Sequence, residues 1–319
     1  QNLVMYVIGG VLIFLAVRKK YEPLLLIPIG FGAILANLPL ADMFAASGKA
    51  GDAGEIGILQ LVYNLGIKTQ FLPPVIFLGV GALTDFRPLL GRPITFLLGA
   101  AAQFGIFVAA LGAFYVFRFT MDESAAIGII GGADGPTSIF VAAILAPHLL
   151  GAVAVAAYSY MSLVPIIQPP IMRMLTTSGE RAIDMPQAKP VSRTAVILFP
   201  IVCAVLAALA VPACAPLIGM LMFGNLLRES GVTDRLFKTA GGPLVNIVTI
   251  FLGITIGATM EGSSFLRFET VSILVLGAFA FCFSTAGGVL YAKVLNLELP
   301  KASRINPCIG AAGVSAVPM

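Results

Sequence analysis

Asp134 is the only charged residue in an apolar stretch, residues 125–147, and it lies between a Gly-Gly pair and a Gly-Pro pair. Glycine and proline interrupt helices, and a carboxylate at membrane depth is costly unless it has a partner. Thr137 and Ser138 follow it with two hydroxyls. Carboxylate, hydroxyl and carbonyl oxygens are the ligands that hard cations take. The segment therefore predicts a Na⁺ site built on Asp134, Thr137 and Ser138, at which one carboxylate can exchange a proton for the ion.

The composition decides which class of protein holds this site. Of the 319 residues, 59% are hydrophobic and 11% are charged, and the mean hydropathy is +1.00, whereas soluble domains carry roughly 25% charged residues. Apolar runs recur along the whole length, which excludes a cleaved signal peptide or a single anchor. We therefore expect an all-α polytopic membrane protein.

Several other kinds of site find no support. The four cysteines stand singly, without metal-ligand or redox spacing, and we interpret them as small core residues. His148 is the only histidine, so it cannot form a catalytic triad or metal site alone, and we expect it at an interface or a helix cap. The sequence has no G-x-x-x-x-G-K-[ST] motif and hence no sign of ATP use. The net charge of +4 says little about nucleic acid, and we expect no such partner.

An internal repeat indicates how the elements around Asp134 are arranged. Four short segments of the first half recur in the same order in the second half. One such match alone would be weak evidence for a repeat, and four in the same order are stronger. We divide the chain into a first transmembrane helix (1–22), repeat 1 (23–167), a cytoplasmic loop with a connecting helix (168–212) and repeat 2 (213–319). The matched segments are 23–35 with 215–227, 76–82 with 250–258, 98–100 with 276–278, and 130–135 with 309–313.

The distribution of basic residues predicts how the segment around Asp134 meets the membrane. Cytoplasmic loops are rich in Lys and Arg. If residues 125–147 dip in from the outer face and return, 15 basic residues lie inside and 4 outside. If the segment crossed the membrane fully, the later loops rich in Lys and Arg would lie outside, against the rule. The second repeat is then inverted, and residues 306–319 enter from the cytoplasm. We expect two inverted repeats whose broken, re-entrant helices meet near the bilayer midplane, as in ion-coupled transporters.

The alternative is that residues 131–138 form an ordinary turn outside the membrane. Their apolar flanks, about nine residues each, are too short to span it.

The repeat also supplies further candidate ligands. Asn306 offers an amide oxygen and Ser315 a hydroxyl opposite Asp134, although Asn306 could instead begin a helix and Ser315 could simply pack among small residues. Tyr160 lies in the middle of the next span, and we expect it to face Tyr158 and Ser162, two residues away on either side. A buried tyrosine hydroxyl needs a partner, so we assign Tyr160 to the site, with an interfacial aromatic belt as the alternative. Asp85 and Glu261, at the ends of paired segments, could be caps or ion-path groups.

Long blocks of this sequence resemble a known family. The chain is similar to the β subunit of the sodium-pumping, biotin-dependent decarboxylases that act on oxaloacetate, methylmalonyl-CoA or glutaconyl-CoA. The blocks are EPLLLIPIGFG at 22–32, GGADGPTSIF at 131–140, AVAAYSYMSLVPIIQPPIM at 154–172, FGNLLRESGV at 223–232 and NPCIGAAGVSAVPM at 306–319.

The resemblance implies a function that composition could not show. The β subunit removes CO₂ from carboxybiotin and couples this to Na⁺ export with proton consumption. The resemblance implies catalytic roles for Asp134, Tyr160 and Ser315, contacts with carboxybiotin for Asn306, Gly310 and Ser315, and Na⁺ binding by Asp134 and Asn306. Implied partners are a biotin carrier protein, a carboxyltransferase α subunit and a small γ subunit, around a trimer of β subunits in the lipid of the bacterial inner membrane.

Two departures and two alternatives accompany the resemblance. Cys308 and Ala311 stand where other members often carry a branched apolar residue and Ser, both beside the site. The family continues past residue 319 with a functional Arg, so we expect this sequence to be C-terminally incomplete. A Na⁺-coupled carboxylate carrier or Na⁺/H⁺ antiporter would share the repeats and the buried acid. A purely structural anchor for soluble subunits is the third hypothesis, and a buried acid in a broken helix argues against it.

Overall fold

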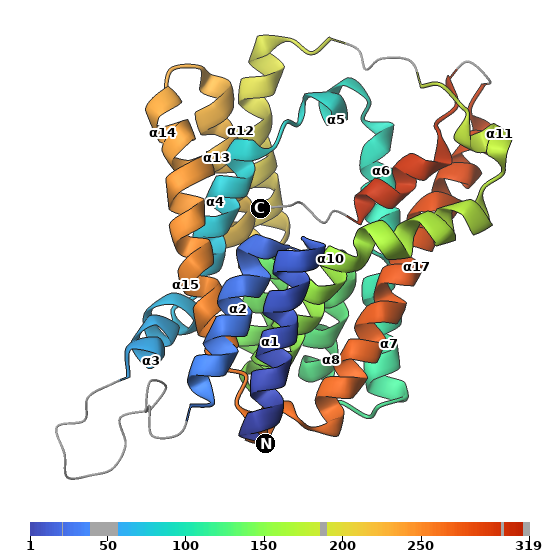
Figure 1. Ribbon diagram of the computed structural model, residues 1–319. Coiled ribbons are helices and arrows are strands. Elements are labelled where there is room, and N and C mark those ends of the chain that lie inside the picture. Colours follow the sequence, from blue (N-terminus) through green and yellow to red (C-terminus); the bar gives the residue numbers. More distant parts are fainter. Residues whose placement is uncertain (21, 39–56, 186–189, 301–302, 315–319) are drawn as a thin grey trace.

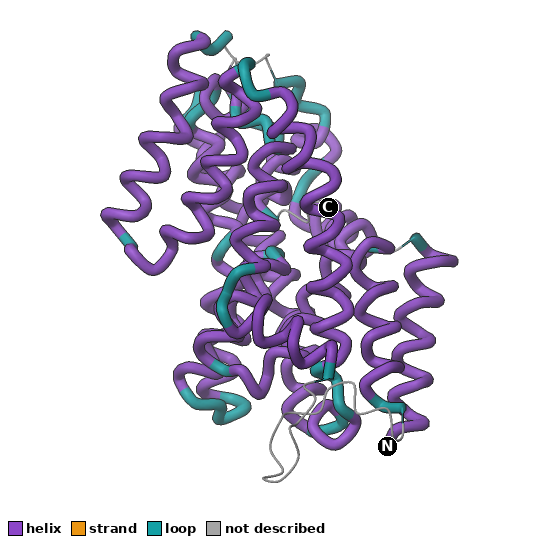
Figure 2. Tube along the Cα trace, turned by 90° about the vertical axis from the view of Figure 1, so that its left-hand side faces the viewer, coloured by secondary structure: helices purple, strands orange, loops and turns teal. Residues whose placement is uncertain are grey.

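The computed structural model describes residues 1–20, 22–38, 57–185, 190–300 and 303–314, and this part of the chain is helical throughout, without a strand (Figures 1 and 2). The first half contains α1 (Asn2–Lys19), α2 (Pro23–Ala36), α3 (Ile58–Tyr63), η1 (Asn64–Lys68), α4 (Leu72–Leu83), α5 (Arg87–Gly91), α6 (Ile94–Ala102), α7 (Phe104–Tyr115), α8 (Met121–Gly128), η2 (Ile129–Gly132), α9 (Gly135–Leu145) and η3 (Pro147–Leu149). The second half contains α10 (Leu150–Leu175), α11 (Ser178–Arg181), α12 (Arg193–Ala210), η4 (Pro212–Cys214), α13 (Ala215–Ser230), α14 (Asp234–Thr239), η5 (Ala240–Leu244), α15 (Val245–Ala258), α16 (Gly262–Phe265), α17 (Phe268–Glu298) and η7 (Pro307–Gly313).

Five helical stretches in the described residues are long and apolar enough to cross a membrane. A sixth results if the bent pair α3–η1 and α4, which turns by 65°, is one span. This confirms the prediction of an all-α membrane protein with several spans. The five stretches are α1, α6 with α7, α12, α14 to α15, and α17.

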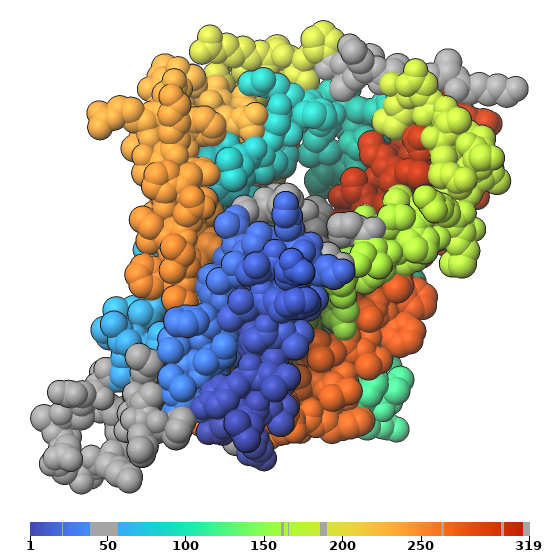
Figure 3. All heavy atoms as spheres, in the orientation of Figure 1, coloured from blue at the N-terminus to red at the C-terminus, as the bar shows by residue number. Residues whose placement is uncertain are grey.

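The helices form two groups with α1 and α2 in front of them (Figure 1). One group contains α4 and α12 to α15, and the other contains α6 to α8, α10 and α17. In the space-filling view, α1 and α2 cover the middle of this face below a hollow, which opens between the teal segment around α5 and the red C-terminal segment (Figure 3).

Two helix pairs, α2 with α15 and α4 with α13, are packed backbone to backbone. In each pair a glycine on either helix lies so close to a main-chain carbonyl of the other that a Cβ would overlap it. Small residues of this kind are what allow membrane helices to approach closely. The close approaches are Gly32 to Ile254, Gly257 to Ile29, Gly81 to Leu221 and Gly224 to Leu78.

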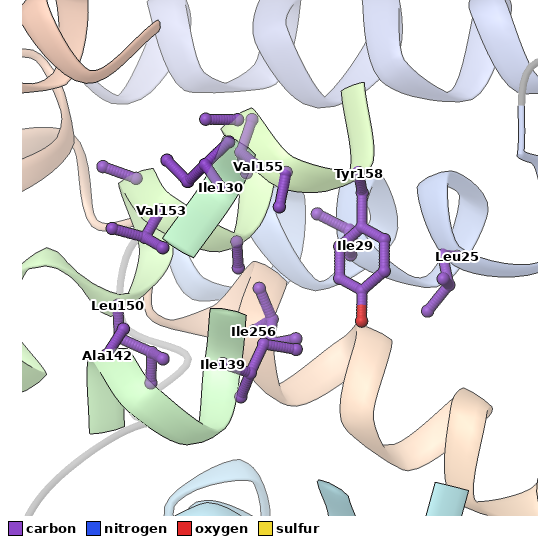
Figure 4. Packing of buried hydrophobic residues seen from close by; sticks show 14 of the residues in the cluster. Leu25, Ile29, Ile130, Ile139, Ala142, Leu150, Val153, Val155, Tyr158 and Ile256 are labelled. Carbon is purple, nitrogen blue, oxygen red and sulfur yellow. The ribbon is translucent and has the colours of Figure 1, made fainter. Parts of the chain in front are cut away.

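The main apolar core is centred on the first half of α10. Residues from Leu150 to Tyr158 are almost fully buried there, and side chains of α2, α9 and α15 surround them (Figure 4). Small residues such as Ala154 and Ala156 dominate this half of α10, so its neighbours can approach it closely.

The candidate span over residues 94–115 contains a local break at Gln103, where α6 ends and α7 begins, and the whole stretch is long and apolar enough to cross. After residues 39–56, which lie outside the described part of the chain, α3 and η1 follow with Leu59 and Ile67 buried. Apolar side chains at these positions bury surface against the core, which local glycine content does not reveal.

Candidate functional site

The apolar segment around Asp134 is broken as predicted. The short turn η2 ends at Ala133, which has a left-handed backbone (φ 56°), and α9 begins directly after Asp134 with Gly135 and Pro136. Proline is favoured in the first turn of a helix because it has no N–H to leave unsatisfied. The break thus lies between two short helices and places Asp134 at the N-cap of α9.

The Asp134 side chain is held by the first turn of α9. The hydroxyl of Thr137 donates a hydrogen bond to one carboxylate oxygen, and the Thr137 main-chain N–H donates to the other at 3.5 Å. The Ser138 hydroxyl donates to the main-chain oxygen of Asp134 at 2.8 Å. The positive end of the α9 dipole stabilises the ionised carboxylate, which remains only partly buried. Asp134, Thr137 and Ser138 are therefore together, as their spacing predicted.

The two ends of the broken segment meet each other. Glu123, in the first turn of α8, lies 2.8 Å from the ring of His148, which follows α9. Glu123 also forms a capping box with Thr120. A cavity of about 250 Å³ lies beside this pair and is also lined by Arg267 and Glu269 of the α17 end. The chain therefore enters and leaves the segment at the same place, so residues 121–148 form a helical hairpin with Asp134 near its tip.

The tip of this hairpin packs on α7 and α17. A Cβ on Gly131 would lie 2.7 Å from the carbonyl carbon of Gly105, so the two backbones are in direct contact. The Ser284 hydroxyl of α17 donates to the main-chain oxygen of Gly131 at 2.8 Å. Ser284 is fully buried, so this bond satisfies a polar group that would otherwise be costly in the core.

Gly310, a site residue that the family resemblance implies, packs on the same helix one turn further along. A Cβ on Gly310 would lie 2.8 Å from the main-chain nitrogen of Val289 and closer still to Gly288. Ser284 and Gly288 are four residues apart, which is about 6 Å along a helix. The two glycine-rich segments, around Gly131 and around Gly310, therefore contact α17 within one turn of each other.

Asn306 occupies the N-cap of η7. Its side-chain oxygen accepts from the N–H of Cys308 at 3.0 Å, and its amide donates to the main-chain oxygens of Arg181 and Ile183 at 2.8 and 3.3 Å. The helix-entry alternative is therefore observed, and these contacts tie η7 to the segment after α11 rather than to Asp134. Ser315 lies outside the described residues.

The segment around α11 is anchored by a charged contact to α17. Glu180 lies 3.1 Å from the ammonium of Lys293. The main-chain N–H of Thr177 and, more weakly, Lys293 hold the pKa of Glu180 below its ordinary value. This fixes the residues with which Asn306 bonds.

Tyr160 and Tyr158 do not share one environment, so the expectation that Tyr160 faces Tyr158 was wrong. Residues two apart on a helix point to different faces. Tyr160 contacts α17, where its ring lies 5.8 Å from that of Phe281 and its hydroxyl donates to the main-chain oxygen of Leu274. Tyr158 instead packs on Gly135.

Asp85 and Glu261 have local roles at helix ends. Asp85 accepts from the N–H of Arg87 at 3.0 Å and pairs with Arg228 at 3.7 Å, and Glu261 is the N-cap residue of α16.

The structure also adds two polar residues that the sequence reading did not select. Gln103 stands at the α6–α7 break, with its side-chain oxygen beside Gly132, and Ser284 bonds the hairpin tip. Gln103 is a single polar residue in a long apolar run, and Ser284 stands beside Thr285 in another, which was the available signal.

The oxygen-bearing groups at the break are of the kind that bind a small hard cation. Within the described ranges, no three His, Cys, Asp or Glu side chains gather as metal ligands. One carboxylate, two hydroxyls and the carbonyls of a helix end suit a monovalent ion. The fold and the site therefore define an all-helical membrane protein with a partly buried carboxylate at a helix break.

Comparison with known proteins places this chain in a family. The family described as the Na⁺-transporting oxaloacetate decarboxylase beta subunit matches residues 1–319. The methylmalonyl-CoA decarboxylase subunit beta of Veillonella parvula is 54% identical over 318 residues, covering 100% of this chain and 81% of the relative. The glutaconyl-CoA decarboxylase subunit beta of Acidaminococcus fermentans is 52% identical with the same coverage. The oxaloacetate decarboxylase beta chain of Klebsiella pneumoniae is 49% identical over 367 residues, covering 99% and 84%. The chain belongs to this family of decarboxylase β subunits.

Proposed function

We propose that this protein removes CO₂ from carboxybiotin inside the membrane and couples that reaction to the export of Na⁺ with consumption of a proton. The observation that carries the proposal is Asp134, a partly buried carboxylate at a helix break of a membrane protein, to which the Thr137 hydroxyl donates a hydrogen bond. The names of the relatives, all β subunits of decarboxylases, support the reaction class.

Inverted repeats are supported by the glycine contacts. The sequence match pairs Gly32 with Gly224 and Gly81 with Gly257. Gly32 of α2 packs on α15, and its match Gly224 of α13 packs on α4, which is the repeat counterpart of α15. In the same way, Gly81 of α4 packs on α13, and its match Gly257 of α15 packs on α2, the repeat counterpart of α13. A two-fold relation between the repeats requires this exchange. We propose the divisions 1–22, 23–167, 168–212 and 213–319 on this basis.

A re-entrant course for residues 125–147 is supported by the hairpin. Its entrance and exit meet at Glu123 and His148, and α8 and α9 have only 8 and 11 residues. A span needs about 20 residues. Both limbs therefore reach only part of the way and return.

The ion site has Asp134, Thr137 and Ser138 as its first ligands, with Asn306 joining them when Na⁺ is bound. Asn306 would have to exchange its present bonds to Cys308, Arg181 and Ile183 for the ion. Such a change of partners would link occupation of the site to movement of η7.

Carboxybiotin reaches the site from the cytoplasmic side, beside Asn306, Gly310 and Ser315. When the N–C bond of carboxybiotin breaks, CO₂ leaves and the ureido nitrogen takes a proton, which Ser315 and Tyr160 relay. Moving one charge against about 100 mV costs about 2.3 kcal/mol. Decarboxylation must therefore drive the change that turns the Na⁺ site outward.

The assembly that this function needs is larger than the chain. A biotin carrier protein delivers carboxybiotin, a carboxyltransferase α subunit loads it, and a small γ subunit joins a trimer of β subunits in the inner membrane of a bacterium. The relatives' designations as beta subunits or beta chains of decarboxylases support the need for partner subunits.

Asp134→Asn tests the proposal in the assembled complex, reconstituted into vesicles. We expect loss of both ²²Na⁺ transport and Na⁺-stimulated release of CO₂ from free carboxybiotin. Asp122→Asn, an exposed acid of α8 in the same hairpin, should leave both unchanged. Coupled transport by Asp134→Asn would sink the scheme, and Na⁺ transport by the unaltered protein without decarboxylation would favour a plain secondary transporter.

A further inference from the structure

The hydroxyl of Tyr158 is a buried polar group without a hydrogen-bond partner in the structure. Tyr158 lies on α10 and is fully buried, with 0% of its surface exposed, and its hydroxyl oxygen forms no hydrogen bond. Leaving such a group unpaired costs roughly 1–3 kcal/mol. Most buried polar groups have a protein or water partner, and those that do not require an explanation. Phenylalanine would fill the same space without this cost.

The hydroxyl lies directly beside the break that holds Asp134. A Cβ added to Gly135, the first residue of α9, would lie 2.8 Å from the Tyr158 oxygen and would overlap the ring. Only glycine therefore allows the ring to approach the N-terminus of α9. Tyr158 extends from α10 beside Leu25 and Ile29 of α2 (Figure 4).

The acid next to this oxygen along the chain is Asp134, which directly precedes the Gly135 that the hydroxyl contacts. The nearest side chains are otherwise apolar, including Leu25 and Ile29. A neutral oxygen with free lone pairs, in an apolar core beside the helix break that holds a carboxylate, is suited to a cation rather than to an anion.

We propose that the Tyr158 hydroxyl oxygen is a ligand of the monovalent cation that is bound at Asp134. The inference rests on the proposed function, because it needs an ion at that carboxylate. It explains why a tyrosine is placed where a phenylalanine would pack equally well. It also gives Gly135 a specific role, which is to keep the space through which the oxygen reaches the ion.

Tyr158 and Tyr160 then have separate tasks. The Tyr160 hydroxyl already donates to the main-chain oxygen of Leu274 on α17, whereas the Tyr158 hydroxyl has no bond to give up. An ion ligand that is free before the ion arrives is pre-organised, which favours affinity. Replacing Tyr158 should therefore change the affinity for Na⁺ more than the rate at saturating Na⁺.

The test is Tyr158→Phe in the assembled complex, with CO₂ release from free carboxybiotin measured as a function of Na⁺. We expect the Na⁺ concentration for half-maximal activation to rise about tenfold, the effect of losing about 1.4 kcal/mol of ion binding, with a smaller change in the maximal rate. The ratio of Na⁺ to Li⁺ activation should change as well. Tyr115→Phe, whose side chain is 63% exposed, is the matched control and should behave like the unaltered protein.

A second measurement keeps the result interpretable if the variant is inactive. Saturating Na⁺ should raise the melting temperature of the unaltered protein, because a ligand that binds only the folded state stabilises it, and this rise should be smaller in Tyr158→Phe. An unchanged rise, or an unchanged activation curve, would overturn the role of Tyr158 while the proposed function stands. If the unaltered protein shows no Na⁺ dependence in either measurement, the proposed function itself fails.

Discussion

The contact between Gly288 and Gly310 gives the sharpest structural prediction. A Cβ added to Gly288 would lie 2.8 Å from the carbonyl carbon of Gly310 and closer still to its oxygen. Ordinary van der Waals contact begins at 3.4 Å, so Gly288→Ala must separate α17 from η7 by at least about 0.6 Å. Both partners are backbone, so no side chain can turn away to relieve the overlap. Overpacking of this kind costs about 1–3 kcal/mol.

The displacement should affect function more than stability. If η7 carries carboxybiotin contacts, moving it shifts those groups relative to Asp134, and a misplacement of about 1 Å can cost about 100-fold in rate. We therefore expect Gly288→Ala to lower CO₂ release by tenfold or more. The melting temperature should fall by roughly 2–12 °C, because overpacking costs about 1–3 kcal/mol and about 1 kcal/mol shifts Tm by roughly 2–4 °C in proteins of 150–250 residues.

The assay compares CO₂ release and thermal unfolding for Gly288→Ala and Gly219→Ala in the same complex. Gly219 lies within α13 and has open space around its Cβ position, so its replacement should be neutral or slightly stabilising. Wild-type activity in Gly288→Ala, together with a normal melting temperature, would refute the idea that close contact between η7 and α17 positions the groups of η7 relative to Asp134.

Three further outcomes follow from single contacts. Thr137→Val removes the hydroxyl that donates to Asp134. The half-activating Na⁺ concentration should rise about tenfold, because hydrogen bonds to charged groups are worth about 1.5–3 kcal/mol. Thr137→Ser keeps the hydroxyl and should behave normally, and equal Na⁺ activation curves for both variants would contradict this role. Asn37→Ala leaves two buried main-chain groups around α16 without their partner, so the melting temperature should fall as expected for a loss of about 2–3 kcal/mol, and an unchanged value would disprove it. Glu180 has a lowered pKa, so its stabilisation, under about 1 kcal/mol, is present at neutral pH and is lost as the pH falls through the folded-state pKa. The difference in stability between Glu180→Gln and the unaltered protein should therefore disappear in acid, and a difference that persists there would be evidence against it.

Local chemistry made the break at Asp134 predictable. Glycine and proline on either side of one acid interrupt a helix in any surroundings. Thr137 and Ser138 follow Asp134 by three and four residues, which is the spacing at which an N-cap residue forms hydrogen bonds with the first turn of a helix. The same reasoning identified most apolar spans, because their length and hydropathy are properties of the sequence alone. Gly310 came instead from the family resemblance, and the structure puts Gly310 on α17 close to the Asp134 hairpin.

Contacts between segments that are distant in the sequence could not be predicted from local sequence patterns. Gln103 interrupts a span that hydropathy treats as continuous, since a single polar residue hardly changes an average over 20 residues. Tyr160 was expected to face Tyr158, but the direction of each ring depends on which helix packs against it. Asn306 bonds Arg181 and Ile183, residues more than 120 positions away, and no local pattern encodes that choice.

The sequence by itself therefore determined the class of protein, the helix break and the acid at its centre, because these depend on hydrophobicity, backbone freedom and charge within one short stretch. Only the tertiary structure decided that Glu123 contacts His148 and closes residues 121–148 into a hairpin, whereas the return of residues 125–147 was already expected from the basic residues. It also decided that Gly131 and Gly310 reach α17 within one turn of each other. It left the Tyr158 hydroxyl unpartnered beside Gly135, because burial and the loss of partners arise only when helices from across the chain close around a side chain.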